Sequence, residues 1–221
     1  MAPDGCGDAD NPKKGDDLLP PGAYARHDES PDDQFYSLPR KVVHIDEGAM
    51  GALGRLYAER LPSGGRVLDL MSSWRSHLPG DLHLREVVGL GMNAEEMAEN
   101  PQLNRSIVHD LNRDSRVPFG DEEFDGAVCA VSVQYMTNPL PVFREMRRVL
   151  RPGAPFVVSF SNRCFPTKAV AVWLGTTDRE HTELVRTYFE VAGGWVDITD
   201  EDRSPGDGGD PLYIVWARTH P

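Results

Sequence analysis

Seven apolar stretches of strand length, most of them separated by segments with helical spacing, constrain the fold of this chain more than any other feature. They occupy residues 66–70, 86–90, 105–110, 124–133, 154–161, 194–199 and 211–218. Alternating strands and helices predict a parallel sheet, because parallel neighbours need long crossover connections. We therefore expect an α/β protein with a Rossmann-like, doubly wound sheet of seven mostly parallel strands.

The connection between the last two stretches differs from the others. Residues 200–210 read DEDRSPGDGGD, which is too polar and too rich in Gly and Pro to form a covering helix. The last two strands are therefore predicted to pair as an antiparallel β-hairpin that ends the sheet.

Composition divides the chain into two parts. Residues 1–33 are dominated by Asp, Pro, Gly and Lys, and such a segment buries too little apolar surface to offset the entropy of ordering. A helix is expected soon after it, with Asp46 near its N-terminus and apolar residues close to helical spacing at 45, 49, 53, 56 and 61. We predict a disordered leader over 1–33 and one domain over 34–221.

Charge and composition exclude several classes of function. The 221 residues include 35 acidic and 23 basic ones, a net charge of -12, which repels nucleic-acid backbones and anionic membranes. No run approaches the roughly 18 apolar residues of a membrane span, and the first residues lack the pattern of a signal peptide. Cys6, Cys129 and Cys164 lack the paired spacing of a zinc site or a disulfide framework. We expect a soluble, cytoplasmic protein with no nucleic-acid or membrane partner and no structural metal.

Two segments carry a family resemblance: VLDL at 67–70 and FDGAVCAVSVQYMTNPLPVFREMRRVLRPGAPFVVSFSN at 124–162. Over about residues 67–161 the chain resembles the class I S-adenosylmethionine-dependent methyltransferases of the type 11 domain group. In that family, the piece beginning at Arg144 is a helix, a turn carried here by Pro152 and Gly153, and the fifth strand. The resemblance implies S-adenosyl-L-methionine as the cofactor and in-line methyl transfer to a small molecule.

The first cofactor-binding position departs from the family pattern. Family members follow the first strand with an acidic residue and a G-x-G-x-G loop. Here the acid is Asp69, but residues 71–80 read MSSWRSHLPG, without the expected glycines. The hydroxyls of Ser72 and Ser73 can bind a carboxylate or cap a following helix. That helix must be short, because Pro79 and Gly80 break it.

The second cofactor-binding position also departs from the family pattern, and the third agrees with it. Alignment places Gly91 where the family has the carboxylate that binds both ribose hydroxyls. Asn93 can supply a single amide oxygen instead, and Glu95 or Glu96 can reach back. Asp110 and the backbone amide of Leu111 match the pair that meets the adenine. The implied cofactor site comprises Asp69, Met71, Ser72, Ser73, Gly91, Asn93, Asp110, Leu111 and Ser132.

Methyl transfer from a sulfonium mainly requires that nucleophile, methyl carbon and sulfur be aligned and that water be kept out. A base helps only if the acceptor must lose a proton. The pattern does not identify a catalytic residue. Its candidates for the base are Tyr36, His44 and Tyr135, with His77 beside them. Arg40 and Arg163 can bind an anionic substrate. Alternation predicts Ser132 and Gln134 on one face of the fourth strand, and Val133 and Tyr135 on the other.

Alternative functions follow from the same departures. The missing glycines and ribose acid favour a catalytically silent member of the fold that binds a nucleoside or a protein partner, whereas Asp69 and Asp110 favour the enzyme. A nicotinamide dehydrogenase is disfavoured because the G-x-G-x-x-G fingerprint is absent. A nucleophilic Cys164 and a metal held by His44, His77, His109, Asp46 and Asp110 are minor alternatives. The residues specify neither the methyl acceptor nor the oligomeric state.

Overall fold

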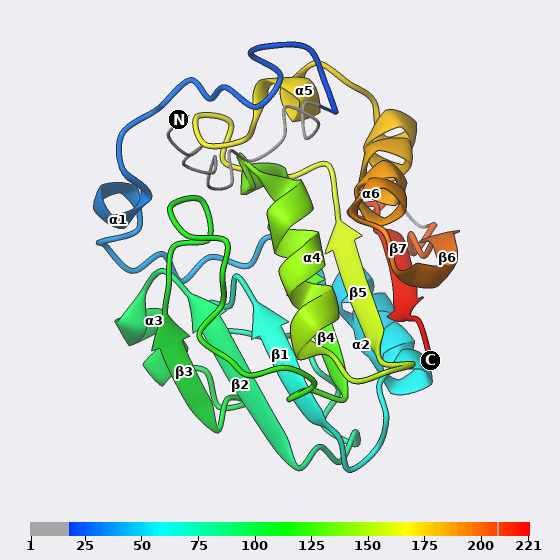
Figure 1. Cartoon of the computed structure of the whole chain (residues 1–221). Helices are drawn as coiled ribbons and strands as arrows, with labels where there is room; N and C mark the ends of the chain where they lie inside the picture. Colours follow the sequence, from blue (N-terminus) through cyan, green and yellow to red (C-terminus); the bar gives the residue numbers. More distant parts are fainter. Residues whose placement is uncertain (1–17, 207) are drawn as a thin grey trace, which may run out of the picture.

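The computed structural model describes residues 18–206 and 208–221. Seven strands form one sheet in the order β3-β2-β1-β4-β5-β7-β6 (Figure 1). The strands β3, β2, β1, β4 and β5 run parallel, and β7 is antiparallel to both β5 and β6. The predicted doubly wound sheet with a terminal hairpin is thus confirmed. The strands are β1 (Arg66–Leu70), β2 (Glu86–Gly91), β3 (Arg105–Val108), β4 (Gly126–Ala130), β5 (Pro155–Phe160), β6 (Trp195–Asp202) and β7 (Tyr213–Thr219).

Helices cover both faces of the sheet. Figure 1 shows α4 in front of the strands and α2 behind them. Strand side chains alternate between two apolar cores: Leu68 packs into the core that holds α4 and α6, and Val67 into the core that holds α2. The β1 strand is therefore buried on both faces, as is typical of a parallel sheet. The helices are α1 (Asp32–Phe35), α2 (Glu47–Arg60), α3 (Ala94–Ala98), α4 (Pro139–Val149), α5 (Ala171–Leu174) and α6 (Asp178–Ala192), with a 3-10 turn, η1 (Val133–Tyr135).

Local sequence signals account for the ends of two helices. Asp46 is the N-cap of α2, and its carboxylate accepts a hydrogen bond from the Ala49 N–H at 2.9 Å. After α4, Gly153 takes the left-handed conformation at φ +76°, which glycine adopts without steric cost. The predicted helix at Asp46 and the predicted Pro-Gly turn are both confirmed.

The fourth strand is shorter than the sequence predicts. The apolar stretch continues to residue 133, but β4 ends at Ala130 and Val131 has a positive φ of 43°. This left-handed residue turns the chain into η1, in which Val133, Gln134 and Tyr135 are all buried. The alternation that we predicted from Ser132 onward is therefore wrong, because the chain is no longer extended there.

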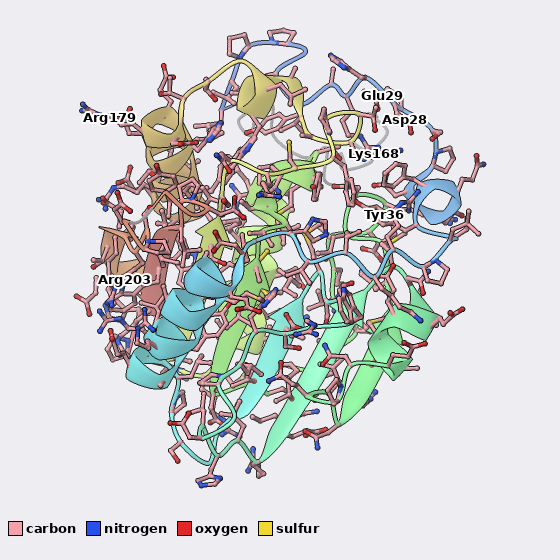
Figure 2. All side chains as sticks on the ribbon, turned by 180° about the vertical axis from the view of Figure 1, so that it is seen from behind. Asp28, Glu29, Tyr36, Lys168, Arg179 and Arg203 are labelled. Atoms are coloured by element: carbon pink, nitrogen blue, oxygen red, sulfur yellow. The ribbon has the colours of Figure 1, made fainter. Side chains whose placement is uncertain are left out.

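Part of the predicted leader lies against the domain. Residues 1–17 lie outside the described residues, but Asp28 donates its N–H to the Thr167 carbonyl at 2.9 Å. Lys168 is fully buried, and its Nζ donates to the Ser30 carbonyl at 2.6 Å and lies 3.4 Å from an Asp28 carboxylate oxygen. Figure 2 shows Lys168 beside Asp28 and Glu29. The division into leader and domain at residue 33 stays a prediction.

None of the helices in the described part of the chain combines the length and the apolar character needed to cross a bilayer.

Candidate functional site

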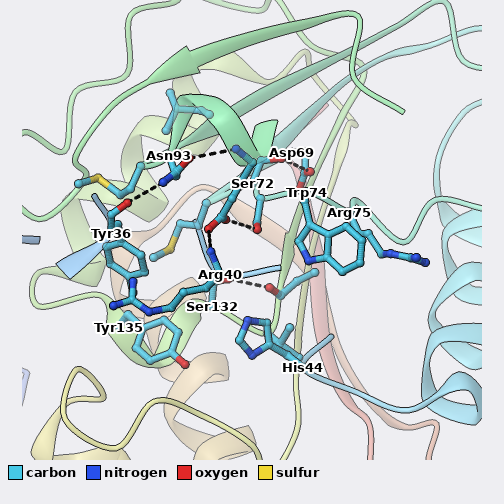
Figure 3. A pocket seen from close by; sticks show the side chains of 18 of the residues that line it. Tyr36, Arg40, His44, Asp69, Ser72, Trp74, Arg75, Asn93, Ser132 and Tyr135 are labelled. Atoms are coloured by element: carbon cyan, nitrogen blue, oxygen red, sulfur yellow. Dashed lines mark hydrogen bonds between the residues drawn. The ribbon is translucent and has the colours of Figure 1, made fainter. Parts of the chain in front are cut away.

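A cavity of about 110 Å³ lies at the carboxyl ends of β1, β2, β3 and β4 (Figure 3). Open α/β sheets bind their ligands at this edge. The structure brings all twelve residues of the predicted cofactor and catalytic sets to this one cavity, although the role of each stays a prediction. The cofactor candidates that line it are Asp69, Met71, Ser72, Ser73, Gly91, Asn93, Asp110, Leu111 and Ser132, and the catalytic candidates are Tyr36, His44 and Tyr135.

The loop after β1 replaces glycines with residues that form their own hydrogen bonds. Met71 has a φ of 58°, a left-handed conformation that glycine adopts more readily than methionine. Ser72 donates its hydroxyl to Asp69 Oδ2 at 2.6 Å, and Ser73 donates to Glu96 Oε2 at 2.5 Å. The predicted short helix is wrong, because residues 71–85 form turns and extended loop. The serine hydroxyls therefore bind carboxylates of the protein instead of capping a helix.

Asp69 is a buried carboxyl group with no Lys or Arg partner among the described residues. Its exposed fraction is 2%, and Ser72 and Ser76 each donate a hydroxyl to Oδ2 at 2.6 Å. Burial raises the pKa of Asp69 to about 6, and the two serine hydrogen bonds oppose that rise. The family acid is thus held inside the protein by the serine-containing loop.

Gly91, which the resemblance predicts at the place of the ribose-binding acid, lies against the loop after β1. The Ser72 N–H donates to the Leu90 carbonyl at 2.9 Å, which brings the loop across the end of β2. A β-carbon at residue 91 would lie 2.0 Å from the Ser72 carbonyl oxygen. No side chain fits there while the loop keeps this path.

Asn93 and Glu96 are already engaged with other segments of the protein. Asn93 is the N-cap of α3, where its Oδ1 accepts from the Glu96 N–H at 3.0 Å. Its Nδ2 donates to the Tyr36 carbonyl at 2.8 Å. Glu96 is 7% exposed, and its Oε1 accepts from the Arg40 N–H at 2.5 Å. Glu96 therefore does reach back toward the cavity, where it contacts the segment before α2.

That segment, residues 36–44, forms one wall of the cavity, and we call it the strap. Three hydrogen bonds tie its backbone to the domain, at Tyr36, Arg40 and Val42 (Figure 3). The third runs from Trp74 Nε1 to the Val42 carbonyl at 3.0 Å. Trp74 therefore lines the cavity and holds the strap through this bond.

The other end of the cavity keeps polar groups available. Asp110 Oδ1 accepts from the N–H groups of Asn112 and Arg113 at 2.9 and 3.3 Å, as in a turn closed by an aspartate. Within residues 18–206 and 208–221, nothing donates to Asp110 Oδ2 and nothing accepts from the Leu111 N–H. The Asp110 Oδ2 acceptor and the Leu111 N–H donor are therefore both available to a ligand, on adjacent residues.

The two tyrosine candidates differ from the histidine candidate in protonation. Burial raises the pKa values of the Tyr36 and Tyr135 phenols far above the ordinary value, so both stay protonated at neutral pH. The Tyr135 hydroxyl also accepts from the Phe165 N–H at 2.8 Å. Burial lowers the pKa of His44, against the opposing charge of Glu96, so its imidazole is neutral at pH 7.

The two arginine candidates for anion binding differ in their position and in their partners. Arg163 forms an ion pair with Asp210 at 2.7 Å. Arg40 lines the cavity and has no carboxylate within ion-pair distance among the described residues; its guanidinium lies 4.0 Å from the centre of the Phe35 ring. Of these two residues, Arg40 is the one at the cavity.

The two minor alternatives find no support at this site. His44, His77 and His109 all line the cavity, yet the described residues contain no group of three His, Cys, Asp or Glu side chains arranged to hold a metal. Burial raises the pKa of the Cys164 thiol, which disfavours the nucleophilic thiolate.

Sequence reasoning missed several residues of the cavity, among them Asp32 and Phe165. Asp32 lay in the predicted leader, but it is buried, forms an ion pair with Arg26 at 2.7 Å and accepts from Asn112 Nδ2 at 2.8 Å. Asp32 follows the oppositely charged Arg26 by six residues. Such pairs are common in solvated segments, so this one did not indicate a site. Phe165 lies in the loop after β5, where it stacks on Tyr135.

Residues 75–158 match the model of a family described as a methyltransferase domain. The biotin biosynthesis bifunctional protein BioHC of Teredinibacter turnerae is 33% identical over 81 residues, which cover 36% of this chain and 14% of that protein. The chain spans between 14% and 50% of the length of the first curated relatives that it matches.

Solved structures show the same fold at low sequence identity. The [4+2]-cyclase SpnF aligns with a TM-score of 0.59 and 17% identity, over 85% of this chain and 91% of the cyclase. Phosphoethanolamine N-methyltransferase 2 of Haemonchus contortus, solved in complex with S-adenosyl-L-methionine, aligns with a TM-score of 0.55 and 13% identity, over 77% of this chain and 52% of that one. Together with the strand order, these similarities show that the chain has the class I methyltransferase fold, and residues 75–158 of it match a methyltransferase domain.

Proposed function

We propose that the protein transfers a methyl group from S-adenosyl-L-methionine to a small molecule in the cavity at the carboxyl ends of β1–β4. The observation that carries the proposal is the free pair at Asp110 and Leu111, a hydrogen-bond acceptor and a donor beside each other in the one cavity that reaches all four strand ends. An adenine presents the complementary pair, an amino donor and a ring-nitrogen acceptor.

The two ends of the cavity carry groups that fit the cofactor, whereas its centre lacks the ribose-binding acid of the family pattern. Asp110 Oδ2 and the Leu111 N–H would hold the adenine. The N–H groups of Ser73, Trp74 and Arg75 have no acceptor among the described residues and would meet the carboxylate of the methionine part. At Gly91 no side chain is available for the ribose. When bound, the cofactor supplies a methyl group on a positively charged sulfur, and the residues around it align the acceptor and exclude water.

The size of the cavity requires the strap to move on binding. Small-molecule sites have volumes of about 300–1,000 Å³, and this cavity measures about 110 Å³. Three hydrogen bonds hold the strap over one side of it, and each such bond contributes only about 1 kcal/mol net. Opening by the strap would admit both cofactor and acceptor.

Relatives support the cofactor and the type of reaction. The Haemonchus contortus enzyme was solved with S-adenosyl-L-methionine, and a Marinomonas relative, 29% identical over 66 residues, is a malonyl-[acyl-carrier protein] O-methyltransferase. Because the described residues include no membrane-spanning helix and the net charge is -12, a small molecule is the acceptor that we propose.

Thermal unfolding with S-adenosylhomocysteine tests the proposal. A ligand bound only by the folded state stabilises it by mass action, by about 2.7 kcal/mol at a hundredfold excess over Kd. We expect a rise in Tm for the wild-type protein, loss of that rise in Asp110→Ala, and retention in Asp33→Asn, a control at an exposed carboxylate. No rise at millimolar ligand would contradict the proposal.

A second candidate is a catalytically silent protein that binds a nucleoside or a protein partner. The close approach of Gly91 to Ser72, which removes the ribose acid, favours it, and the fold of the [4+2]-cyclase is similar. A rise in Tm with S-adenosylhomocysteine, but no S-adenosylhomocysteine formed from S-adenosylmethionine with any acceptor, would favour this candidate.

A further inference from the structure

Two histidine rings line the cavity without a hydrogen-bond partner among the described residues, those of His44 and His77. In contrast, His109 and His181 each bond a backbone carbonyl oxygen from Nε2, at 2.7 and 2.8 Å. Both side chains are half-buried, so their ring nitrogens are free to bond water or a ligand that enters the cavity.

The two rings line the same cavity from different segments. His44 ends the strap, and its ring stands edge-on to Phe165 with the ring centres 5.0 Å apart. His77 belongs to the loop after β1 and has a left-handed φ of 55°. Figure 3 shows the His44 ring between Tyr135 and Trp74 in this view.

The other titratable groups of the cavity are unsuited to accept a proton. Tyr36 and Tyr135 stay protonated. The carboxylate of Asp32 is paired with Arg26, and that of Asp69 is buried against two serines. Both oxygens of Glu96 accept hydrogen bonds from Arg40 and Ser73. Asp110 Oδ2 is free, but the proposed function assigns it to the adenine, and His109 bonds the Asp114 carbonyl. This leaves the imidazoles of His44 and His77 as the groups that can bond the hydroxyl of a methyl acceptor and then take its proton.

Aromatic rings surround the His44 side of the cavity. Tyr135 stacks on Phe165 with ring centres 6.1 Å apart and an angle of 28° between the planes. Phe35 meets Phe165 edge to face at 5.7 Å. Flat apolar molecules pack well against such rings. Strap residues Val42 and Val43 add apolar surface to the same wall.

We infer that the methyl acceptor is a hydroxyl compound with a flat apolar skeleton, a phenol or similar alcohol, whose O–H donates to the imidazole of His44 while the neutral ring of His77 donates its N–H to the same oxygen. This inference rests on the proposed function and names the substrate class of the same cavity. His44 is the base and His77 a positioning residue. When the cofactor is bound, the acceptor oxygen forms a bond to its methyl carbon, the carbon–sulfur bond breaks with its electron pair going to sulfur, and the hydroxyl proton goes to a ring nitrogen of His44.

The protonation states agree with these roles. Burial lowers the pKa of His77 to about 4, helped by Arg75 and His44, so His77 stays neutral across the physiological range. Burial also lowers the pKa of His44, and the negative charge of Glu96 opposes that change. A base that is neutral at pH 7 and still able to take a proton matches this chemistry.

Binding of p-cresol, followed through the imidazole NMR resonances, tests the inference. We expect p-cresol to shift the ring signals of His44 and His77, and 4-methylanisole, which lacks the hydroxyl hydrogen, to leave them unchanged. His44→Gln should weaken p-cresol binding about fivefold to tenfold, the loss of one hydrogen bond, whereas the exposed control His83→Gln should not. Equal effects of the two compounds, or no shift at millimolar p-cresol, would overturn the inference.

The pH dependence of p-cresol binding is a second test, because a histidine with a purely structural role would not affect it. Binding of p-cresol should weaken as the pH falls and His44 takes a proton, with a midpoint below the ordinary histidine value of 6.5. Glu96→Gln should move that midpoint further down, since the charge of Glu96 raises the pKa of His44. A midpoint unchanged in Glu96→Gln would contradict the assignment of His44.

The titrations are run with and without S-adenosylhomocysteine, so that failure of the proposed function can be distinguished from failure of the inference about the two histidines. Loss of S-adenosylhomocysteine binding contradicts the proposed function, whereas p-cresol selectivity without it still supports the two histidines. With S-adenosylmethionine, His44→Gln should lower kcat for p-cresol about 100-fold or more, the scale of general-base catalysis. Equal methylation of p-toluidine or p-toluate by the wild-type protein would overturn the hydroxyl class.

Discussion

Gly91 lies so close to Ser72 that a β-carbon on residue 91 would be 2.0 Å from the Ser72 carbonyl oxygen. The contact joins the end of β2 to the loop after β1, at the position where the family has a ribose-binding carboxylate. Restoring that acid should therefore damage this protein instead of improving its cofactor binding.

We predict that Gly91→Asp destabilises the fold by at least about 3 kcal/mol, because the new side chain meets backbone and buries a carboxylate. Urea or thermal unfolding measures the change. The control is Gly80→Asp, since a β-carbon at Gly80 meets no atom within 4 Å and surface changes usually stay within about 0.5 kcal/mol. A stable Gly91→Asp protein with tighter S-adenosylhomocysteine binding would show that the loop has another path.

The raised pKa of Asp69 predicts that the free energy of unfolding changes with pH. Its pKa in the folded protein is about 6, above the ordinary value of 3.8, so the folded state prefers the protonated form. This contribution is complete below pH 3.8 and is lost as the pH rises to 6. Asp69→Asn cannot ionise, so its stability relative to the wild type should improve by about 2 to 3 kcal/mol between pH 4 and pH 7. Denaturant unfolding at both pH values measures the difference, and a constant difference would contradict the raised pKa.

Lys168 anchors residues 28–32 to the loop before α5. Its buried Nζ lies 3.2 Å from an Asp32 carboxylate oxygen, and removal of one partner of a buried ion pair costs about 3 kcal/mol or more. Lys168→Met should lower Tm and speed amide exchange at residues 26–32. Lys41→Met, at the exposed pair with Glu99, is the matched control and should leave Tm nearly unchanged. Slow exchange at residues 26–32 in Lys168→Met would show that other contacts hold this segment.

Trp74 controls how easily the strap opens. Trp74→Phe removes the hydrogen bond to the Val42 carbonyl while keeping an aromatic ring. We expect amide exchange at Arg40 and Val42 to rise about threefold to tenfold, which corresponds to roughly 1 kcal/mol. Arg75→Gln removes a guanidinium that stacks on the indole at 4.4 Å and should leave that exchange unchanged. Equal exchange rates in Trp74→Phe and the wild type would mean that the strap opens without breaking this bond.

The sequence by itself determined the sheet, the hairpin and the location of the site. Strand patterns with period two and helix patterns with longer period act over a few residues, so 66–70 and 155–160 are recognisable without tertiary contacts. Signals such as Asp46 at an N-cap and Gly153 in a turn are equally local. Because strand ends in a parallel sheet meet at one edge, residues predicted one strand at a time line one cavity.

Only the tertiary structure decided what those residues do to one another. The left-handed Val131 ends β4 early, and the serine hydroxyls bind Asp69 and Glu96 instead of capping a helix. The strap crosses to α3, 56 residues away along the chain. Such contacts depend on where loops cross in space, and the free energies involved come from packing and burial between distant segments. No pattern within a short stretch of residues encodes them.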